Sequence, residues 1–163
     1  MSLKLRNQNL NMPTKRLQWK DLMEVKKNIF TAIEMMKFMR SNNGIGLAAN
    51  QVGIRKSIFV MEIDGNEFYI FDPQITGWSK DEIIMEEGCL SFPGKKFKIS
   101  RPESITVLYQ TVDPATIKNL DLAGSFMKEI CVETELTGLA ARCFQHEFDH
   151  LQGITFDQKK VID

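Results

Sequence analysis

The stretch QHEFDHLQG, residues 145–153, contains both histidines of the 163-residue chain, His146 and His150, with Glu147 between them. Positions i and i+4 of a helix lie one above the other on the same face, so both imidazoles could reach one metal ion while Glu147 stands beside it. Such a pair is half of a metal site, because a tetrahedral catalytic centre takes three protein ligands and leaves its fourth position for water. The third ligand cannot be another histidine.

The residues around this stretch predict the fold. Apolar side chains recur at helical spacing from Thr134 to Leu151, with Gly153 just past the end, so the histidines should lie on a C-terminal helix. A second amphipathic helix is predicted near the N-terminus, from Trp19 to Met39, and the turn residues Asn42-Asn43-Gly44 should end it. Between the helices, β-type runs predict antiparallel strands at residues 57–63, 67–71, 82–85, 97–100, 104–110 and 126–133, the first two joined as a hairpin at Asp64-Gly65-Asn66.

Length and composition bound the class of protein. The order of helix, many strands and helix indicates an α+β fold whose antiparallel sheets wrap around the C-terminal helix, and the length suits a single domain over residues 1–163. The 21 basic and 21 acidic side chains give no net charge, which argues against nucleic acid as the main partner. No apolar run approaches the roughly 20 residues that cross a bilayer, and the polar N-terminal segment has no hydrophobic signal core. We therefore expect a cytoplasmic protein without a membrane association.

The third metal ligand is expected upstream of the helix. Helical H-E-x-x-H also arises by chance, and the tail after His150 offers only Asp157 and Asp163, which would have to fold back. Cys89, in EEGCLSFP, is the best candidate because thiolate binds Zn or Fe well and the neighbouring Gly and Pro indicate a loop. Without the histidine pair, Cys89 would be interpreted as a small buried residue beside a turn. Cys143 shares the helical face of His146, so spacing does not exclude it, although a pocket-lining or core cysteine is the stronger interpretation.

The segment GIGLAANQ, residues 44–51, is unusual for its small residues. It lacks G-x-G-x-x-G and G-K-[ST] and follows a helix, so a nucleotide site is not indicated. On its own the segment favours a tightly packed turn. Its small residues would also let the backbone approach a ligand closely, and Gln51 could donate an amide N–H to a developing oxyanion.

With GIGLAANQ, EEGCLS and QHEFDHLQG in this order, the sequence closely resembles the peptide deformylases. Together the motifs span residues 44–153. The resemblance implies an enzyme that removes the formyl group from N-terminal formylmethionine of nascent peptides. It implies a metal ion as cofactor, Fe(II) natively, with Zn(II), Ni(II) or Co(II) able to replace it.

Carried over position by position, the resemblance implies a full set of site residues. The metal ligands would be Cys89, His146 and His150, and Glu147 would act as general base and acid. Gln51 and the backbone N–H of Leu90 would bind the oxyanion, and the Gly46 backbone would hold substrate. The pocket for the methionine side chain would be lined by Ile45, Leu139, Arg142 and Cys143. The charge of Arg142 departs from the family pattern and could open or narrow the mouth of this pocket. Glu87 and Arg101 would pair beside the metal ligands.

The ends of the chain depart from the family pattern. The N-terminal arm lacks the usual Asp-Pro signature, and the 13 residues after His150 are too few for the long helix by which many members dock on the ribosome. We therefore expect a short form, of a kind that phages also encode, with at most a weak ribosome contact. Two alternatives remain at this stage: an H-E-x-x-H metalloprotease, and an inactive deformylase-like protein in which the metal ion only stabilises the fold.

Overall fold

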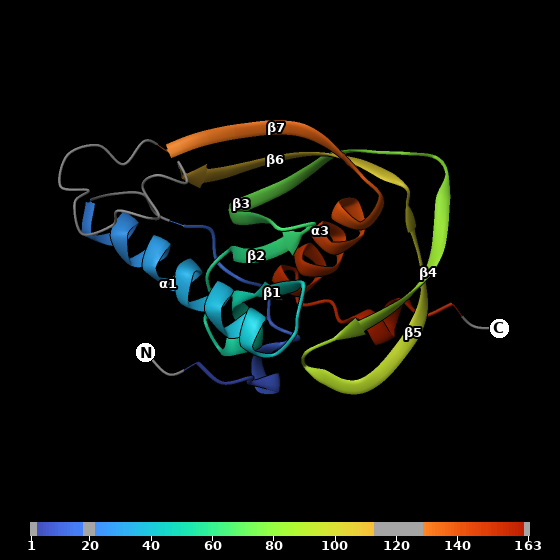
Figure 1. Cartoon of the computed structure of the whole chain (residues 1–163), viewed down its shortest axis with the longest axis horizontal. Helices are drawn as coiled ribbons and strands as arrows, with labels where there is room; N and C mark the ends of the chain where they lie inside the picture. The colour runs from blue at the N-terminus through green and yellow to red at the C-terminus, as the bar shows by residue number, and fades with distance from the viewer. Residues whose placement is uncertain (1–2, 18–21, 113–128, 162–163) are drawn as a thin grey trace.

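The computed structural model describes residues 3–17, 22–112 and 129–161, and Figure 1 shows the arrangement of the elements. In chain order these are the 3-10 helix η1 (Asn7–Asn9), α1 (Leu22–Ser41), β1 (Gly46–Ala48), the 3-10 helix η2 (Ala49–Val52), β2 (Ile58–Ile63), β3 (Asn66–Trp78), β4 (Glu82–Cys89), β5 (Phe92–Pro102), β6 (Ser104–Val112), β7 (Glu129–Thr137), α3 (Gly138–Leu151) and the 3-10 helix η3 (Phe156–Lys159). The strands of both sheets pair antiparallel, so the predicted α+β class is confirmed.

A five-stranded sheet with the order β1-β2-β3-β6-β7 lies between the two helices (Figure 1). Side chains of a strand alternate between its faces. In β2, Ile58 and Val60 belong to the hydrophobic cluster under α1, whereas Phe59 and Met61 belong to the cluster that includes Phe144 of α3. Because both faces of β2 are covered, its run of apolar residues is buried without interruption.

Helix α1 covers one face of this sheet. Ile29, Met35 and Met39 of its apolar stripe are fully buried, and Val25 and Ile33 are partly buried. The helix stops where the sequence predicts, because Asn43 takes a left-handed conformation at φ 56° and the Gly44 N–H bonds back to the Met39 carbonyl. The predicted start at Trp19 lies outside the described residues.

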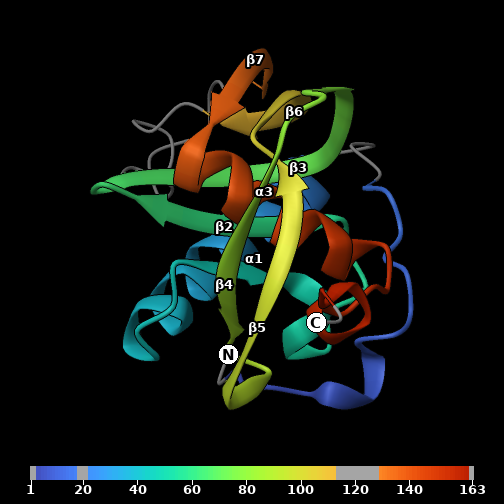
Figure 2. The same ribbon diagram turned by 90° about the vertical axis from the view of Figure 1, so that its right-hand side faces the viewer.

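The two-stranded sheet β4-β5 lies on the other side of α3, as Figure 2 shows. The two strands pair from Glu82↔Pro102 down to Cys89↔Phe92, with a register shift after Gly88. The chain after α3 returns to this sheet, where the Val161 N–H bonds to the Lys98 carbonyl. Helix α3 is therefore enclosed by two sheets, as predicted.

Several predicted boundaries are wrong. The C-terminal helix begins at Gly138, because residues 134–137 are the end of β7 and pair with residues 104–107 of β6. The strands predicted at 67–71, 82–85 and 97–100 are parts of longer strands, and the one predicted at 126–133 is described only from residue 129 and runs to residue 137. Residues 46–52 form a short strand and a 3-10 helix in place of the turn favoured for GIGLAANQ.

Candidate active site

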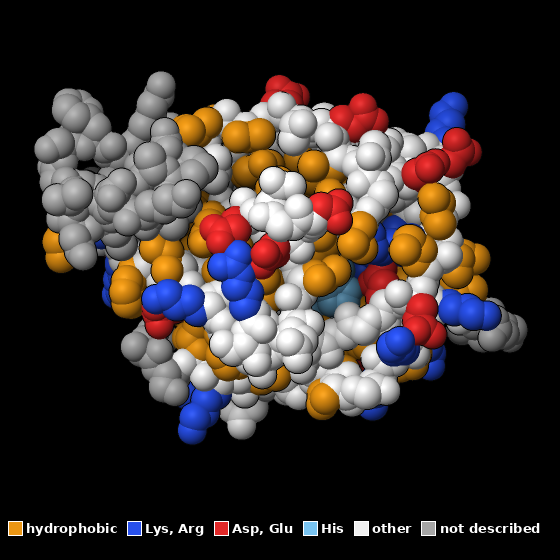
Figure 3. Space-filling view, viewed as in Figure 1, with side chains coloured by type: hydrophobic (Ala, Val, Ile, Leu, Met, Phe, Trp, Pro, Cys, Tyr) orange, Lys and Arg blue, Asp and Glu red, His pale blue; other side chains and the backbone are white. Residues whose placement is uncertain are grey.

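A pocket of about 600 Å³ opens where β1, the β4-β5 turn and α3 meet. Its walls are Leu5, residues 42–46 with Gln51, residues 85–90 and 92–96, and Leu139, Arg142, Cys143, His146 and Glu147 of α3. In the space-filling view of Figure 3, histidine surface is visible inside this hollow among apolar and charged side chains. Because the N-terminal half, the middle and the C-terminal helix all contribute to the walls, the pocket joins the three sequence motifs.

Three side chains could hold one metal ion: Cys89 and His146, which line the pocket, and the buried His150 next to them. The Sγ of Cys89 and ring nitrogens of His146 and His150 all lie within 4.8 Å of one another, and Cys89 Sγ is 3.3 Å from His150 Nε2. With bonds of about 2.0–2.3 Å, ligand atoms of a tetrahedral ion stand roughly 3–4 Å apart, so the three donors fit one ion. Helix α3 supplies both histidines one turn apart, and the end of β4 supplies the cysteine.

Cys143 takes a different place in the pocket. Its thiol is buried and donates to the Ile45 carbonyl at 3.6 Å. Burial, together with the carboxylates of Glu147 and Glu87, raises the pKa of this thiol well above its ordinary value, so the thiol stays protonated. A protonated thiol is a poor metal ligand, which favours Cys89 over Cys143.

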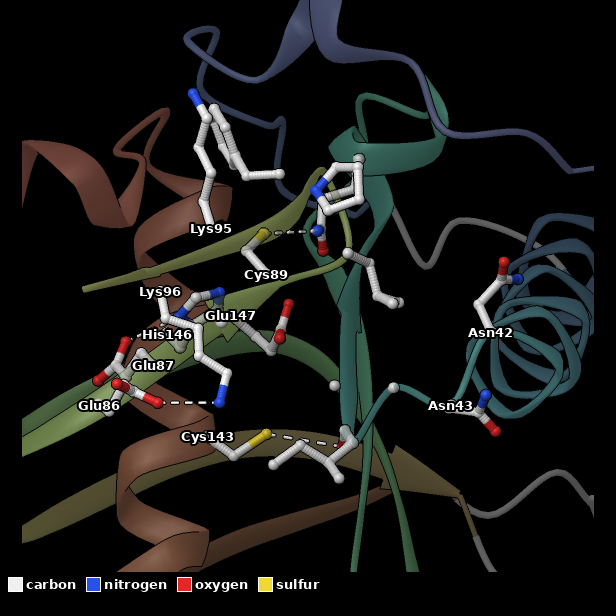
Figure 4. A pocket seen from close by; sticks show the side chains of 18 of the residues that line it. Asn42, Asn43, Glu86, Glu87, Cys89, Lys95, Lys96, Cys143, His146 and Glu147 are labelled. Carbon is white, nitrogen blue, oxygen red and sulfur yellow. Dashed lines mark hydrogen bonds and ion pairs between the residues drawn. The ribbon is translucent and has the colours of Figure 1, made fainter. Parts of the chain in front are cut away.

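The two histidines differ in their surroundings. Burial lowers the pKa of His150 well below its ordinary value, which keeps its imidazole neutral as ligation requires. Burial would also lower the pKa of His146, but hydrogen bonds to Cys89 and Glu87 outweigh it and raise that pKa to about 10. His146 Nδ1 lies 2.9 Å from Glu87 Oε2, so this nitrogen donates to the carboxylate, and a metal ion at Nε2 would take the place of the proton there (Figure 4).

Glu87 is the centre of a buried ion cluster behind His146. Arg101 donates to both oxygens of Glu87, at 2.6 and 3.0 Å, so these two residues pair as expected from the sequence. Arg101 also donates to Asp149 at 2.7 Å. Burial alone would raise the pKa of Glu87, but the bonds from His146 and Arg101 hold it far below its ordinary value. Glu87 is therefore a carboxylate that accepts hydrogen bonds and orients His146.

Glu147 is buried beside the ligands, and its Oε2 has no hydrogen-bond partner among the described residues. Burial raises the pKa of Glu147 to about 7, where a carboxyl group can both take and return a proton near neutral pH. The backbone of Gly46 comes so close that an added Cβ would lie 2.4 Å from Glu147 Oε1 and 2.8 Å from Cys143 Sγ. Glycine at position 46 is what allows β1 to pack directly against this face of α3.

Gln51 faces the ligands from the opposite wall. Its Nε2 lies 3.4 Å from Cys89 Sγ and 3.1 Å from Ser91 Oγ. Leu90 follows Cys89 in the turn between β4 and β5 and lines the same pocket. At the mouth, Ile45 and Leu139 are about half exposed. The three sequence motifs thus supply one continuous surface around the three ligands.

A family model for polypeptide deformylases matches residues 3–161. The chain belongs to the polypeptide deformylase family. A peptide deformylase of Thermotoga maritima is 38% identical over 143 residues, which are 87% of this chain and 78% of that protein. The chloroplastic peptide deformylase 1B of rice is 38% identical over 135 residues, 80% of this chain but 45% of the rice protein, so the chain spans less than half of that relative.

The crystal structure of a Thermotoga maritima peptide deformylase has the same fold. It superposes with a TM-score of 0.81 at 33% identity and covers 99% of both chains. Polypeptide deformylases are metal-dependent hydrolases that act on nascent formylated peptides, so this member is a hydrolase of protein biosynthesis and the metalloprotease alternative falls. None of the helices in the described part of the chain is long and apolar enough to span a membrane.

Sequence reasoning missed several residues that surround the site in this deformylase. Ser91 accepts a hydrogen bond from Gln51, and Asp149 binds Arg101 and, at 2.7 Å, Lys159. Phe156 packs against His146, with ring centroids 5.7 Å apart. Ser91 and Asp149 lie inside the quoted motifs, which was the available signal; Phe156 lies in the tail, where no motif marks it.

Proposed function

We propose that this chain removes the formyl group from N-terminal formylmethionine of nascent peptides, with Cys89, His146 and His150 holding the metal ion. The observation that carries the ligand assignment is the convergence of one thiol and two imidazoles within 4.8 Å of one another. A structural zinc site is closed by a fourth protein ligand, and the described residues offer no fourth member of this group. An open position beside Glu147 suits hydrolysis.

The donor set also bears on the identity of the ion. A thiolate with two imidazoles suits Fe(II), Zn(II), Co(II) and Ni(II). We propose Fe(II) as the native ion. The thiolate and Fe(II) are both sensitive to oxygen, so aerobic purification should favour a zinc or nickel form. When bound, the ion would supply Lewis acidity that makes water reactive near neutral pH.

Glu147 would move the proton. Its free Oε2 takes a proton from the attacking water and afterwards gives it to the departing amine, releasing formate. A carboxyl group whose pKa burial holds near 7 can do both in one turnover. Gln51 Nε2 and the Leu90 N–H would donate to the formyl oxygen while it carries negative charge.

The substrate's methionine side chain would enter the apolar part of the pocket. Ile45, Leu139 and the protonated Cys143 give this part its walls, and the Gly46 backbone would hold the peptide beside Glu147. We place the reaction in the cytoplasm, where the three cysteines, all unpaired in the structure, stay reduced.

The decisive experiment measures formate release from formyl-Met-Ala-Ser together with the metal content of the same sample. Deformylation with about one metal ion per chain, abolished by chelation and restored by adding metal, is the expected result. A protein that holds one ion per chain but releases no formate would be the inactive, metal-stabilised alternative. A protein that binds no metal would contradict the ligand assignment.

A further inference from the structure

Arg142 is a buried arginine in α3, one turn before His146. Its side chain lines the pocket, but its guanidinium is bound inside the protein. Nη1 donates to Glu87 Oε1 and to the Ile99 carbonyl, both at 3.0 Å, and Nη2 donates to the Ile83 carbonyl. Arg142 therefore joins α3 to both strands of the β4-β5 sheet.

The charges around Glu87 show what Arg142 adds. Glu87 Oε1 accepts from Arg101 and Arg142, and Oε2 accepts from Arg101 and His146. Arg101 is shared with Asp149, which also binds Lys159 at 2.7 Å, so Arg142 gives Glu87 a second buried guanidinium. Without Arg142, Glu87 would keep only the guanidinium that it shares with Asp149, and the bond that orients His146 would weaken.

The metal ligands come from two elements whose separation is set by these contacts. Helix α3 carries His146 and His150, whereas Cys89 lies at the end of β4. Figure 4 shows Glu87, from the same strand as Cys89, turned toward His146. Arg142 fastens this strand to α3 at two places, the Ile83 carbonyl near its start and Glu87 two residues before Cys89.

We propose that Arg142 is a positioning residue of the metal site: it holds β4 against α3 and aims Glu87 at His146, and so sets the distance of Cys89 from the two histidines. This role rests on the proposed ligands and goes beyond the pocket-lining role expected from the sequence. The planar guanidinium suits it, because a single group reaches one carboxylate and two carbonyls on different strands.

The test uses protein loaded with Co(II), whose visible absorption reports ligand geometry. Arg142→Met keeps the apolar stem that lines the pocket but removes all three hydrogen bonds. We expect the variant to bind Co(II) roughly 10–100-fold more weakly, the usual effect of losing an outer partner of a metal ligand, with shifted cobalt bands. Arg40→Met is the matched control, because Arg40 also binds two carboxylates, Glu62 and Glu67, but is exposed at the end of α1.

Arg142→Lys keeps the test decisive if Arg142→Met does not fold. Its ammonium can reach Glu87 but not both carbonyls, so the loss of Co(II) affinity and the shift of the cobalt bands should be smaller than in Arg142→Met. The proposal would be overturned if either folded variant had the wild-type cobalt spectrum and a Co(II) affinity within about twofold of wild type. So would a raised KM for formyl-Met-Ala-Ser with an unchanged cobalt spectrum, which is the result expected if Arg142 only lines the pocket.

The same spectra separate this inference from the proposed function. Wild-type protein should show a thiolate-to-cobalt band that Cys89→Ala removes. If that band is present in the wild type and the Arg142 variants leave affinity and geometry intact, only the positioning role fails. If the wild type lacks the band, the ligand assignment fails and the positioning role with it.

Discussion

The Ala48 N–H donates to Oε1 of Gln51 at 2.8 Å, and this bond decides which end of the Gln51 amide faces the pocket. With Oε1 held by the backbone, Nε2 points toward Cys89 Sγ and Ser91 Oγ. The oxygen and nitrogen of an Asn or Gln amide are otherwise hard to tell apart, but a backbone N–H can only donate to the oxygen, so this bond identifies Oε1. The amide N–H groups of Gln51 therefore face Cys89 and Ser91, which is the orientation that the proposed oxyanion role needs.

Gln51→Glu should lower kcat for formyl-Met-Ala-Ser by roughly 10²–10³-fold, the usual effect of losing an oxyanion donor. The carboxylate can still accept from Ala48 but offers no N–H, and it adds negative charge beside Cys89. Metal analysis on the same sample should show near-normal content. Ser91→Ala is the control, because it removes a partner of Gln51 and leaves the donor. A kcat within a few-fold of wild type in the Glu variant would remove Gln51 from the reaction.

Cys89→Ala should lower metal content severely, because two histidines alone form an incomplete site. Cys131→Ala is the matched control, since Cys131 is exposed on β7 away from the ligand group. Metal per chain, measured after dialysis, checks both variants. Full retention in the Cys89 variant would show that the third ligand has been misassigned, with Cys143 the next candidate.

Gly46→Ala should destabilise the protein by about 1–3 kcal/mol, as overpacking usually does. The new Cβ would lie 2.4 Å from Glu147 Oε1, so β1 or the carboxylate must move, and deformylation should fall with stability. Thermal unfolding and formate release measure the two effects. Gly88→Ala is the stability control, because its Cβ would meet only the Lys95 carbonyl, at 3.8 Å. Equal stability of both variants would contradict the close approach at Gly46.

Local patterns in the sequence were enough to bring together two of the three proposed ligands. The i, i+4 spacing of His146 and His150 fixes their common face wherever the helix begins. The start of that helix was misjudged because Leu136 fits both a helical and an alternating pattern, and only the pairing of β7 with β6 decides between them. Because β6 and β7 are separate segments of the chain, their pairing cannot be recognised from the local sequence of either one.

Nonlocal contacts explain the rest of what the sequence could not show. Cys89 reaches His150 across 61 residues because the β4-β5 sheet folds over α3. The direction of the Arg142 side chain follows from the same packing. Helical position puts Arg142 on the pocket face, but the carboxylate and carbonyls that bind its guanidinium belong to strands 43 to 59 residues away.

Formyl-methionine peptides should be preferred over formyl-glycine peptides by about one to two decades in kcat/KM. Ile45, Leu139 and Cys143 give an apolar slot, and burying a methionine side chain is worth roughly 1.5–3 kcal/mol. Initial rates of formate release for two peptides that differ only in the first residue provide the measurement. Equal kcat/KM values would remove the pocket assignment and leave the metal site untouched.

Glu147→Gln separates catalysis from metal binding. The amide keeps the shape of the side chain but cannot accept a proton at neutral pH. If Cys89, His146 and His150 hold the ion, metal content and folding should stay near normal. Deformylation should fall roughly 10²–10⁴-fold, the range for losing a general base.

The position of Glu147 makes this split a sharp test. Its Oε2 has no protein partner among the described residues, so an amide nitrogen in its place breaks no hydrogen bond there, and a large loss of rate reflects the proton. A protein whose metal ion only stabilises the fold would have no activity to lose. If the Gln variant retains more than about a tenth of wild-type kcat/KM, well above that range, the proton does not travel through Glu147.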